Sequence, residues 1–175
     1  MILLAACGGG TSATDVDEGD VDPTPTVTAA DTDTDSDTGG GAGGDDACLN
    51  TAEEVSAAFG VEVAEAENTV NPDGDGAACI YHTDKAAFES AMATSLTTGS
   101  LAQTVFDSFA SDDSAEAVSG IGDEAIWFGT NSLFIFRTGD RTLSMSAGGS
   151  VPAAGDDAAV RAILEELART AAGRL

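Results

Sequence analysis

Apolar residues recur three or four positions apart in three segments of the chain, 51–60, 100–109 and 156–175. This spacing gathers them on one face of a helix, so it predicts three amphipathic helices. Asp156 and Asp157 add acidic side chains where the third helix would begin, and such charges are favourable at a helix N-terminus. We therefore expect a folded region with helices near both of its ends.

The first two helices have sequence patterns that define their starts. Thr51 with Glu54, and Ser100 with Gln103, match the capping box, in which the two side chains satisfy the free amide groups of a helix N-terminus. Gly60 predicts the end of the first helix. In the second helix, Leu101, Val105, Phe106 and Phe109 are expected to fall on one face.

Other segments alternate between apolar and polar residues or are rich in β-branched and aromatic residues, as is typical of strands. These segments are 61–70, 78–83, 87–97, 125–128, 133–138 and 141–147. The segment 87–97, with Phe88, Met92 and Leu96 on one face, is compatible with a helix as well. We predict an α+β fold, with an antiparallel sheet of about five strands packed against the N- and C-terminal helices.

The charge is strongly unbalanced, with 31 Asp and Glu against 6 Lys and Arg and a formal net charge of -25. Such a chain is repelled by nucleic acids and by anionic lipid headgroups, so we expect no nucleic-acid partner and no charge-driven docking to membranes. Residues 1–46 contain 11 of the acids and no basic or aromatic residue. The composition therefore divides the chain into an N-terminal tail and a single domain over 47–175.

The first seven residues predict a lipid anchor. Leu4-Ala5-Ala6-Cys7 has the pattern of a bacterial lipobox, in which the cysteine is lipidated. We therefore expect Cys7 to carry a lipid that contains palmitate. Six residues are too few for the apolar region of a signal peptide, so we expect translation to begin further upstream. The alternative is a stray apolar end of a cytosolic protein. No run of 18 apolar residues exists, so the lipid on Cys7 would hold the protein at the extracytoplasmic face of the cell membrane.

Residues 8–46 consist mainly of Gly, Thr, Asp, Ser, Ala and Pro. Low hydrophobicity and uniform negative charge cannot offset the entropy lost on ordering, so we predict a disordered acidic linker. As a flexible coil, these residues would span roughly 35 Å and hold the domain away from the membrane.

Cys48 and Cys79 remain once Cys7 is assigned to the lipid. An even number of cysteines outside the cytoplasm favours a disulfide, which would stabilise the domain by roughly 3 to 4 kcal/mol in the chain-entropy model. Zinc is an alternative, because Cys79-x-x-His82 together with Cys48 offers three ligands, but no fourth ligand is evident. A redox role is disfavoured because the two cysteines are far apart in sequence.

Two further segments could carry polar chemistry. Asn71 to Gly76 matches the first half of a calcium-binding EF-hand loop, and the competing interpretation is a polar turn between two strands. His82 is the single histidine, so a hydrolase would need it beside a carboxylate such as Asp84 or Asp123. We expect no metal and no cofactor.

Aromatic residues provide a candidate ligand surface. Trp127 and Phe128 are consecutive on a predicted strand, so one should face the core and the other the opposite side of the sheet. An exposed ring beside Phe134 or Phe136 would mark a binding surface. Core packing is the alternative for all four residues.

The motifs follow one another along the chain in a particular order. This order is the lipobox at Cys7, the tether 8–46, Cys48, the T-x-E-E-V helix of 51–60, Cys79, the glycine-rich turn of 118–125, the hairpin of 134–145 and the helix of 156–175. In this order the chain resembles a domain-of-unknown-function family of actinobacterial cell-envelope lipoproteins. It departs from that family in having Ile80-Tyr81-His82 after the second cysteine, where Ser-Trp is more usual. The resemblance implies a surface-anchored α+β domain with a Cys48–Cys79 disulfide, and it implies no catalytic residues.

The sequence thus favours a non-enzymatic binding module, anchored to the cell membrane, whose ligand is a protein, glycan or lipid of the cell envelope. A surface spacer or adhesin is one alternative. An envelope hydrolase that uses His82 is the other.

Overall fold

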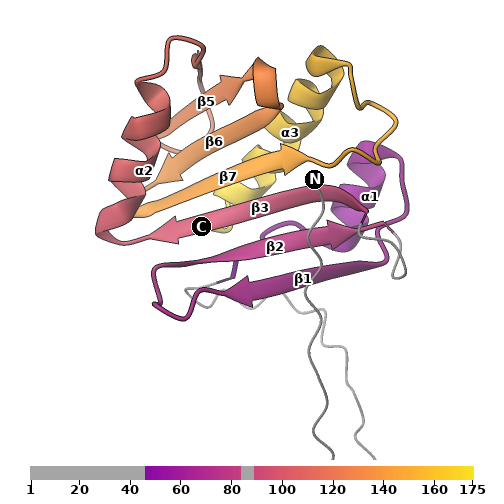
Figure 1. Cartoon of the computed structure of the whole chain (residues 1–175), viewed down its shortest axis with the longest axis horizontal. Helices are drawn as coiled ribbons and strands as arrows, with labels where there is room; N and C mark the ends of the chain where they lie inside the picture. Colours follow the sequence, from indigo (N-terminus) through magenta and orange to yellow (C-terminus); the bar gives the residue numbers. More distant parts are fainter. Residues whose placement is uncertain (1–45, 84–88) are drawn as a thin grey trace, which may run out of the picture. The chain divides into compact units, whose positions relative to one another are not determined.

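The computed structural model describes residues 46–83 and 89–175, all of which belong to one structural unit. These residues form an α+β fold with one antiparallel sheet, as expected, but the sheet has seven strands where about five were predicted (Figure 1). Along the chain the strands are β1 (Glu65–Val70), β2 (Gly76–His82), β3 (Ser90–Thr98), β4 (Glu116–Val118), β5 (Glu124–Phe128), β6 (Leu133–Thr138) and β7 (Arg141–Ala147).

The sheet consists of two meanders that meet at its centre. Its strand order is β1-β2-β3-β7-β6-β5-β4, and every neighbouring pair is antiparallel. The junction is the pair of β3 and β7, in which Leu96 lies opposite Leu143. β1 and β4 are therefore the two edge strands, at opposite ends of the sheet.

Two helices cover one face of the sheet and a third helix lies on the other face (Figure 1). α1 (Ala52–Phe59) and α3 (Asp157–Ala172) contact each other, and α3 packs on β6 and β7. α2 (Ser100–Ala110) lies across β3, β7 and β6 on the opposite face. The prediction of N- and C-terminal helices packed on the sheet is confirmed, and the sheet carries a further helix on its second face.

α1 begins and ends as its sequence predicts. The Thr51 hydroxyl accepts a hydrogen bond from the Glu54 amide at 3.2 Å, and the Glu54 carboxylate accepts one from the Thr51 amide at 2.8 Å. Gly60 ends the helix with φ at 68°, a conformation that glycine adopts without steric cost.

The larger apolar core lies between the sheet and the pair α1 and α3. Met92, Phe134, Phe136 and Leu143 point into it from successive strands and are fully buried. A smaller cluster lies on the α2 side and consists of Phe106, Ile126, Phe128 and Ile135. Both faces of β5 and β6 are therefore buried, which explains why these strands are almost continuously apolar.

The details of α2 differ from the prediction. Ser100 is already inside the helix, Gly99 is the N-cap, and no side chain caps the N-terminus. Gln103 donates a hydrogen bond to Asp107, so the proposed capping box of Ser100 and Gln103 is wrong. Such a short pattern predicts the first residue of a helix only to within one or two positions.

The strands differ from the prediction at two places. β1 begins at Glu65, four residues later than predicted, and all six of its residues are exposed. β4 was not predicted, because its three residues are too few to show alternation. The strand in the segment 87–97 is confirmed as β3, with Met92 and Leu96 buried, whereas Phe88 lies outside the described residues.

Within 46–83 and 89–175, no helix has the length and the apolar composition needed to cross a bilayer.

Candidate functional site

One half of the sheet has an uncovered face. α2 contacts β3, β7 and β6, and no described helix lies over β1 and β2 on the same side. The side chains that β2 directs to this side, Ala78 and Ile80, are exposed, whereas its other side buries Ala77, Cys79 and Tyr81. The alternation of a strand thus gives β2 one face in the core and one open face.

A groove lies at the border between α2 and this open face. It has a volume of about 520 Å³ and is open to solvent along one side. This volume is within the range of roughly 300 to 1,000 Å³ that is usual for small-molecule pockets. The lining consists of Thr69, Val70, Asn71, Pro72, Asp75, Gly76, Ala77, Ala78, Ser95, Leu96, Thr97, Leu101 and Val105. We call this feature the α2 groove.

The residues that form the floor of the α2 groove are small, and they leave space beside α2. Gly76 and Ala78 come from β2, and Ser95 and Thr97 come from β3. At Gly76 no side chain is tolerated, because a Cβ atom there would lie 2.0 Å from the carbonyl oxygen of Leu96. A bulky residue at these positions would fill the space beside α2.

Apolar side chains form the walls. Leu101 and Val105 stand on consecutive turns of α2, and Pro72 stands in the hairpin between β1 and β2. Leu101 is 46% exposed, which is high for an aliphatic residue of this size. Val70 is exposed as well, but it lies opposite Ala77, whose side chain is in the core, so it faces away from α2. An exposed apolar patch at the edge of a groove is a feature of binding sites.

The apolar face predicted for α2 is only partly buried. The helix buries Ala102 and Phe106, whereas Leu101 and Phe109 are exposed. Phe109 packs at an angle against Phe128, with ring centroids 5.8 Å apart. The sequence therefore identified the helix correctly, but it does not indicate that Leu101 and Val105 line a groove while Phe106 is buried.

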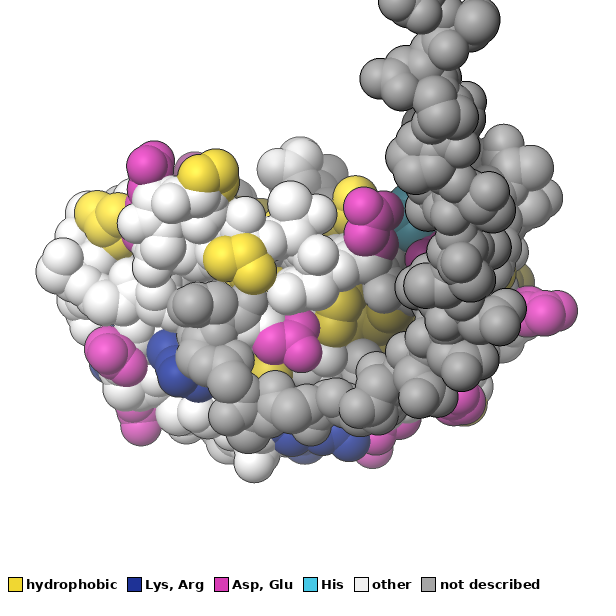
Figure 2. All heavy atoms as spheres, turned by 90° about the horizontal axis from the view of Figure 1, so that it is seen from below, with side chains coloured by type: hydrophobic (Ala, Val, Ile, Leu, Met, Phe, Trp, Pro, Cys, Tyr) yellow, Lys and Arg dark blue, Asp and Glu magenta, His cyan; other side chains and the backbone are white. Residues whose placement is uncertain are grey.

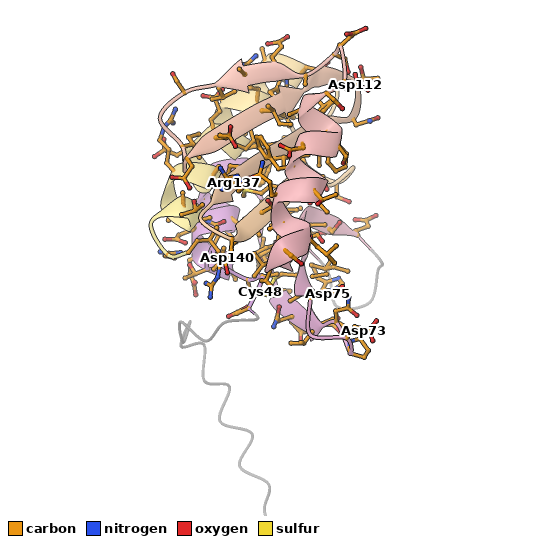
Figure 3. The ribbon with its side chains drawn as sticks, turned by 90° about the vertical axis from the view of Figure 1, so that its left-hand side faces the viewer. Cys48, Asp73, Asp75, Asp112, Arg137 and Asp140 are labelled. Atoms are coloured by element: carbon orange, nitrogen blue, oxygen red, sulfur yellow. A yellow bond between two sulfur atoms is a disulfide. The ribbon has the colours of Figure 1, made fainter. Side chains whose placement is uncertain are left out.

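The only charged side chain in the lining is Asp75. One of its carboxylate oxygens accepts a hydrogen bond from the Asn71 side-chain amide. Asp73 is exposed nearby in the same hairpin, and Figure 3 shows both acids near the end of α2 that is remote from Asp112. The lining contains no Lys or Arg, so the groove has negative character.

The basic side chains near the sheet are held by carboxylates elsewhere. Arg137 donates a hydrogen bond to Glu124 at 2.9 Å. On α3, Arg161 donates one to Glu116 at 2.6 Å. Figure 2 views the molecule from the β1 side, and there acidic side chains are spread over the whole face, apolar side chains lie in its upper and middle parts, and Lys and Arg lie along the lower part.

The segment from Asn71 to Gly76 forms the tight connection of the β1–β2 hairpin. The Asn71 amide donates to the Gly76 carbonyl at 2.8 Å, and Gly74 has φ at 73°. Among the described residues, no group of three or more His, Cys, Asp or Glu side chains is placed to hold a metal ion. This geometry is that of a polar turn.

His82 lies on the open face of the sheet, outside the lining of the α2 groove. Its Nε2 atom is 3.4 Å from a carboxylate oxygen of Glu67, a residue that the sequence did not single out. Asp123 lies at the start of β5, beyond β3, β7 and β6, where it accepts a hydrogen bond from the Gly139 amide. The structure therefore does not join His82 to Asp123, and Asp84 lies outside the described residues.

The four aromatic residues that were proposed as a ligand surface are all in the core. Trp127, Phe134 and Phe136 face α1 and α3, and Phe128 faces α2. None of the four is more than 6% exposed. Because helices cover both faces of the sheet here, the strand alternation exposes neither Trp127 nor Phe128.

The predicted disulfide between Cys48 and Cys79 is confirmed, with a Cα–Cα distance of 5.1 Å. It joins the segment before α1 to β2. A pair of bonded sulfurs leaves no thiolate for zinc, and His82 lies on the other face of β2 from Cys79. Cys7 and the segment up to residue 45 lie outside the described residues.

Comparisons with protein-family models, with curated proteins and with solved structures find no match to this chain.

Proposed function

We propose that the protein is a lipid-anchored, extracytoplasmic binding module and not an enzyme. Cys7 carries the lipid, residues 8–46 form an acidic tether, and the domain over 47–175 binds a component of the cell envelope. The observation that carries the binding role is the α2 groove, an open and largely apolar site beside an uncovered half of the sheet.

The groove favours a binder over a spacer. A spacer needs only a stable surface, whereas Leu101 is kept nearly half exposed beside an open groove. Exposed apolar area of this kind raises the risk of aggregation unless a partner covers it. A binding role supplies that partner.

The anchor rests on the sequence. The lipobox ends at Cys7, and the resemblance to cell-envelope lipoproteins covers the order of motifs through the whole domain. The confirmed Cys48–Cys79 disulfide supports the extracytoplasmic location, because disulfides persist mainly in oxidising compartments.

A site-specific crosslink tests the binding role. A photoreactive phenylalanine analogue replaces Thr69, an exposed lining residue on β1 outside the groove floor, and a matched variant carries it at Asp113, an exposed position outside the groove. On irradiation of intact cells that produce the full chain, position 69 should give a discrete adduct whose mass reveals its chemical class. Equal labelling at positions 69 and 113, or none at either, would contradict a binding role for the groove.

The anchor is tested separately by intact mass and fractionation. The wild-type chain should carry a diacylglyceryl mass increment and remain with the membrane fraction. Cys7→Ala should lose both properties while the Cys48–Cys79 disulfide is retained. A wild-type chain without lipid would contradict the proposed location.

A further inference from the structure

We infer that the α2 groove binds an extended segment of a partner protein that combines apolar side chains with Lys or Arg. This inference rests on the proposed binding function and specifies the class of partner. Its three supports are the apolar walls, the negative charge along one rim and the open shape of the site.

The walls select apolar side chains. Leu101 and Val105 on α2 stand at one side of the groove and Pro72 of the hairpin stands at the other, and the floor between them is made of small residues. Burial of one Leu- or Val-sized side chain between such walls contributes about 1.5 to 3 kcal/mol. The groove therefore provides an anchor position for an apolar residue.

Acidic side chains on the hairpin and along β1 favour a positively charged ligand. Asp75 lines the groove and Asp73 stands in the same hairpin. Along β1, Glu67 and Glu65 lie on the same side of the sheet as the lining residue Thr69, because alternate residues of a strand share a face. Since the lining contains no Lys or Arg, a basic segment meets complementary charge over this side of the groove.

An extended peptide satisfies both requirements at once. Its successive side chains point in opposite directions, so apolar residues can enter the groove while intervening Lys or Arg side chains reach the carboxylates along β1. An anionic bilayer surface would instead be repelled by these acids. The open side of the groove admits a continuous chain, whereas a small ligand would remain largely exposed to solvent.

The test is a subtractive peptide selection on the full chain. Random twelve-residue peptides, on the order of 10⁹ sequences, are first depleted on a synthetic peptide of residues 8–46 and then captured on the wild-type protein. Depletion removes peptides that are held only by the acidic segment 8–46. The captured peptides should be net positive and should contain at least one large apolar residue.

Matched variants then locate the binding. Leu101→Lys should weaken the affinity of the captured peptides at least about tenfold, which corresponds to about 1.4 kcal/mol. Gln103→Lys adds the same charge to α2 at an exposed position outside the lining and should change the affinity less than about twofold. Circular dichroism of both variants checks that α2 remains folded.

The charge contribution has its own pair of variants. Asp75→Asn should weaken binding about threefold to tenfold, whereas Asp113→Asn, outside the groove, should have little effect. The affinity should also fall as the salt concentration rises.

The outcomes separate this inference from the proposed function. Captured peptides that are neutral or acidic, or equal losses in Leu101→Lys and Gln103→Lys, overturn the inference. If the groove crosslink at position 69 yields a glycan or lipid adduct while no peptide is enriched, the binding function is retained and the peptide partner is refuted. If neither experiment gives a groove-specific product, both proposals fail.

Discussion

At the scale of single residues, Tyr81 connects three elements from a buried position. Its hydroxyl donates a hydrogen bond to the Asn50 carbonyl at 2.8 Å and accepts one from the Asn50 amide at 3.3 Å. The Asn50 side chain donates in turn to the Leu167 carbonyl on α3 at 3.1 Å. β2, the start of α1 and the middle of α3 are thus linked through two polar side chains inside the core.

Burial raises the pKa of Tyr81 well above its usual value. The folded state therefore keeps the hydroxyl neutral at pH values where an unfolded chain ionises it, near about 10. Stability linked to this group is fully present below about pH 10 and is lost as the pH rises further. Because the chain has one tyrosine, tyrosinate absorbance reports this residue alone.

We predict that the folded protein forms no tyrosinate at pH 10 to 11, whereas the protein in urea titrates near about 10. Tyrosinate should appear only together with the loss of the circular dichroism of the folded state. Ionisation near pH 10 with an unchanged dichroism spectrum would show that the hydroxyl is not buried as described.

Gly76 is the residue on which the floor of the α2 groove depends. Gly76→Ala places a Cβ atom against the Leu96 carbonyl of the paired strand, so β2 and β3 must move apart. We predict a loss of about 2 kcal/mol or more in the free energy of unfolding, measured by urea denaturation.

Gly149 provides the control, because a Cβ atom there has no neighbour within 4 Å. Gly149→Ala should change the stability by less than about 0.5 kcal/mol. Similar losses in both variants would mean that backbone freedom, and not the close approach of the strands, determines the effect.

At the scale of elements, α2 is the part of the fold that sequence alone predicts least well. Its apolar residues extend around a wide arc of the helix, and the part of this arc that is buried depends on the strands below. Ala102 and Phe106 contact the sheet, whereas Leu101 projects beyond it. The helix itself could be predicted from its periodicity, but its orientation depends on tertiary contacts that the periodicity does not encode.

The opposite case is α1, whose limits are set by local chemistry. Thr51, Glu54 and Gly60 act within one or two helical turns, so their pattern predicts the observed structure. The candidate site illustrates the same contrast. The disulfide follows from counting cysteines, but the groove combines β1, β2, β3 and α2, and no single segment of sequence indicates it.

We predict that the two sides of α2 differ in their contribution to stability. Phe106→Ala removes a ring that is 4% exposed and should destabilise the domain by about 3 kcal/mol or more. Leu101→Ala removes a side chain that is 46% exposed and should cost less than about 1 kcal/mol. Urea denaturation of the two variants measures both values, and a larger loss for Leu101→Ala would contradict the observed orientation of the helix.

At the scale of the whole molecule, the disulfide and the sheet determine stability together. The cysteines are 31 positions apart, so their bond closes a loop that contains α1 and β1. We predict that reduction lowers the free energy of unfolding by about 3 to 4 kcal/mol.

A variant in which Cys48 and Cys79 are both replaced by alanine should have the stability of the reduced protein and should not respond to the reductant. Urea denaturation with and without reductant provides the comparison. An equal response of the wild type and the double variant would show that the reductant acts elsewhere.

The position of this disulfide also has a mechanical consequence. A force that pulls on the chain from its N-terminal side reaches Cys48 first and passes through the sulfur atoms into Cys79 in β2. Residues 49–78, which include α1 and β1, then carry none of the load. The tension enters the sheet at β2, the neighbour of the edge strand β1. The hairpin that forms one wall of the groove would keep its shape under a pull that would otherwise peel β1 away first.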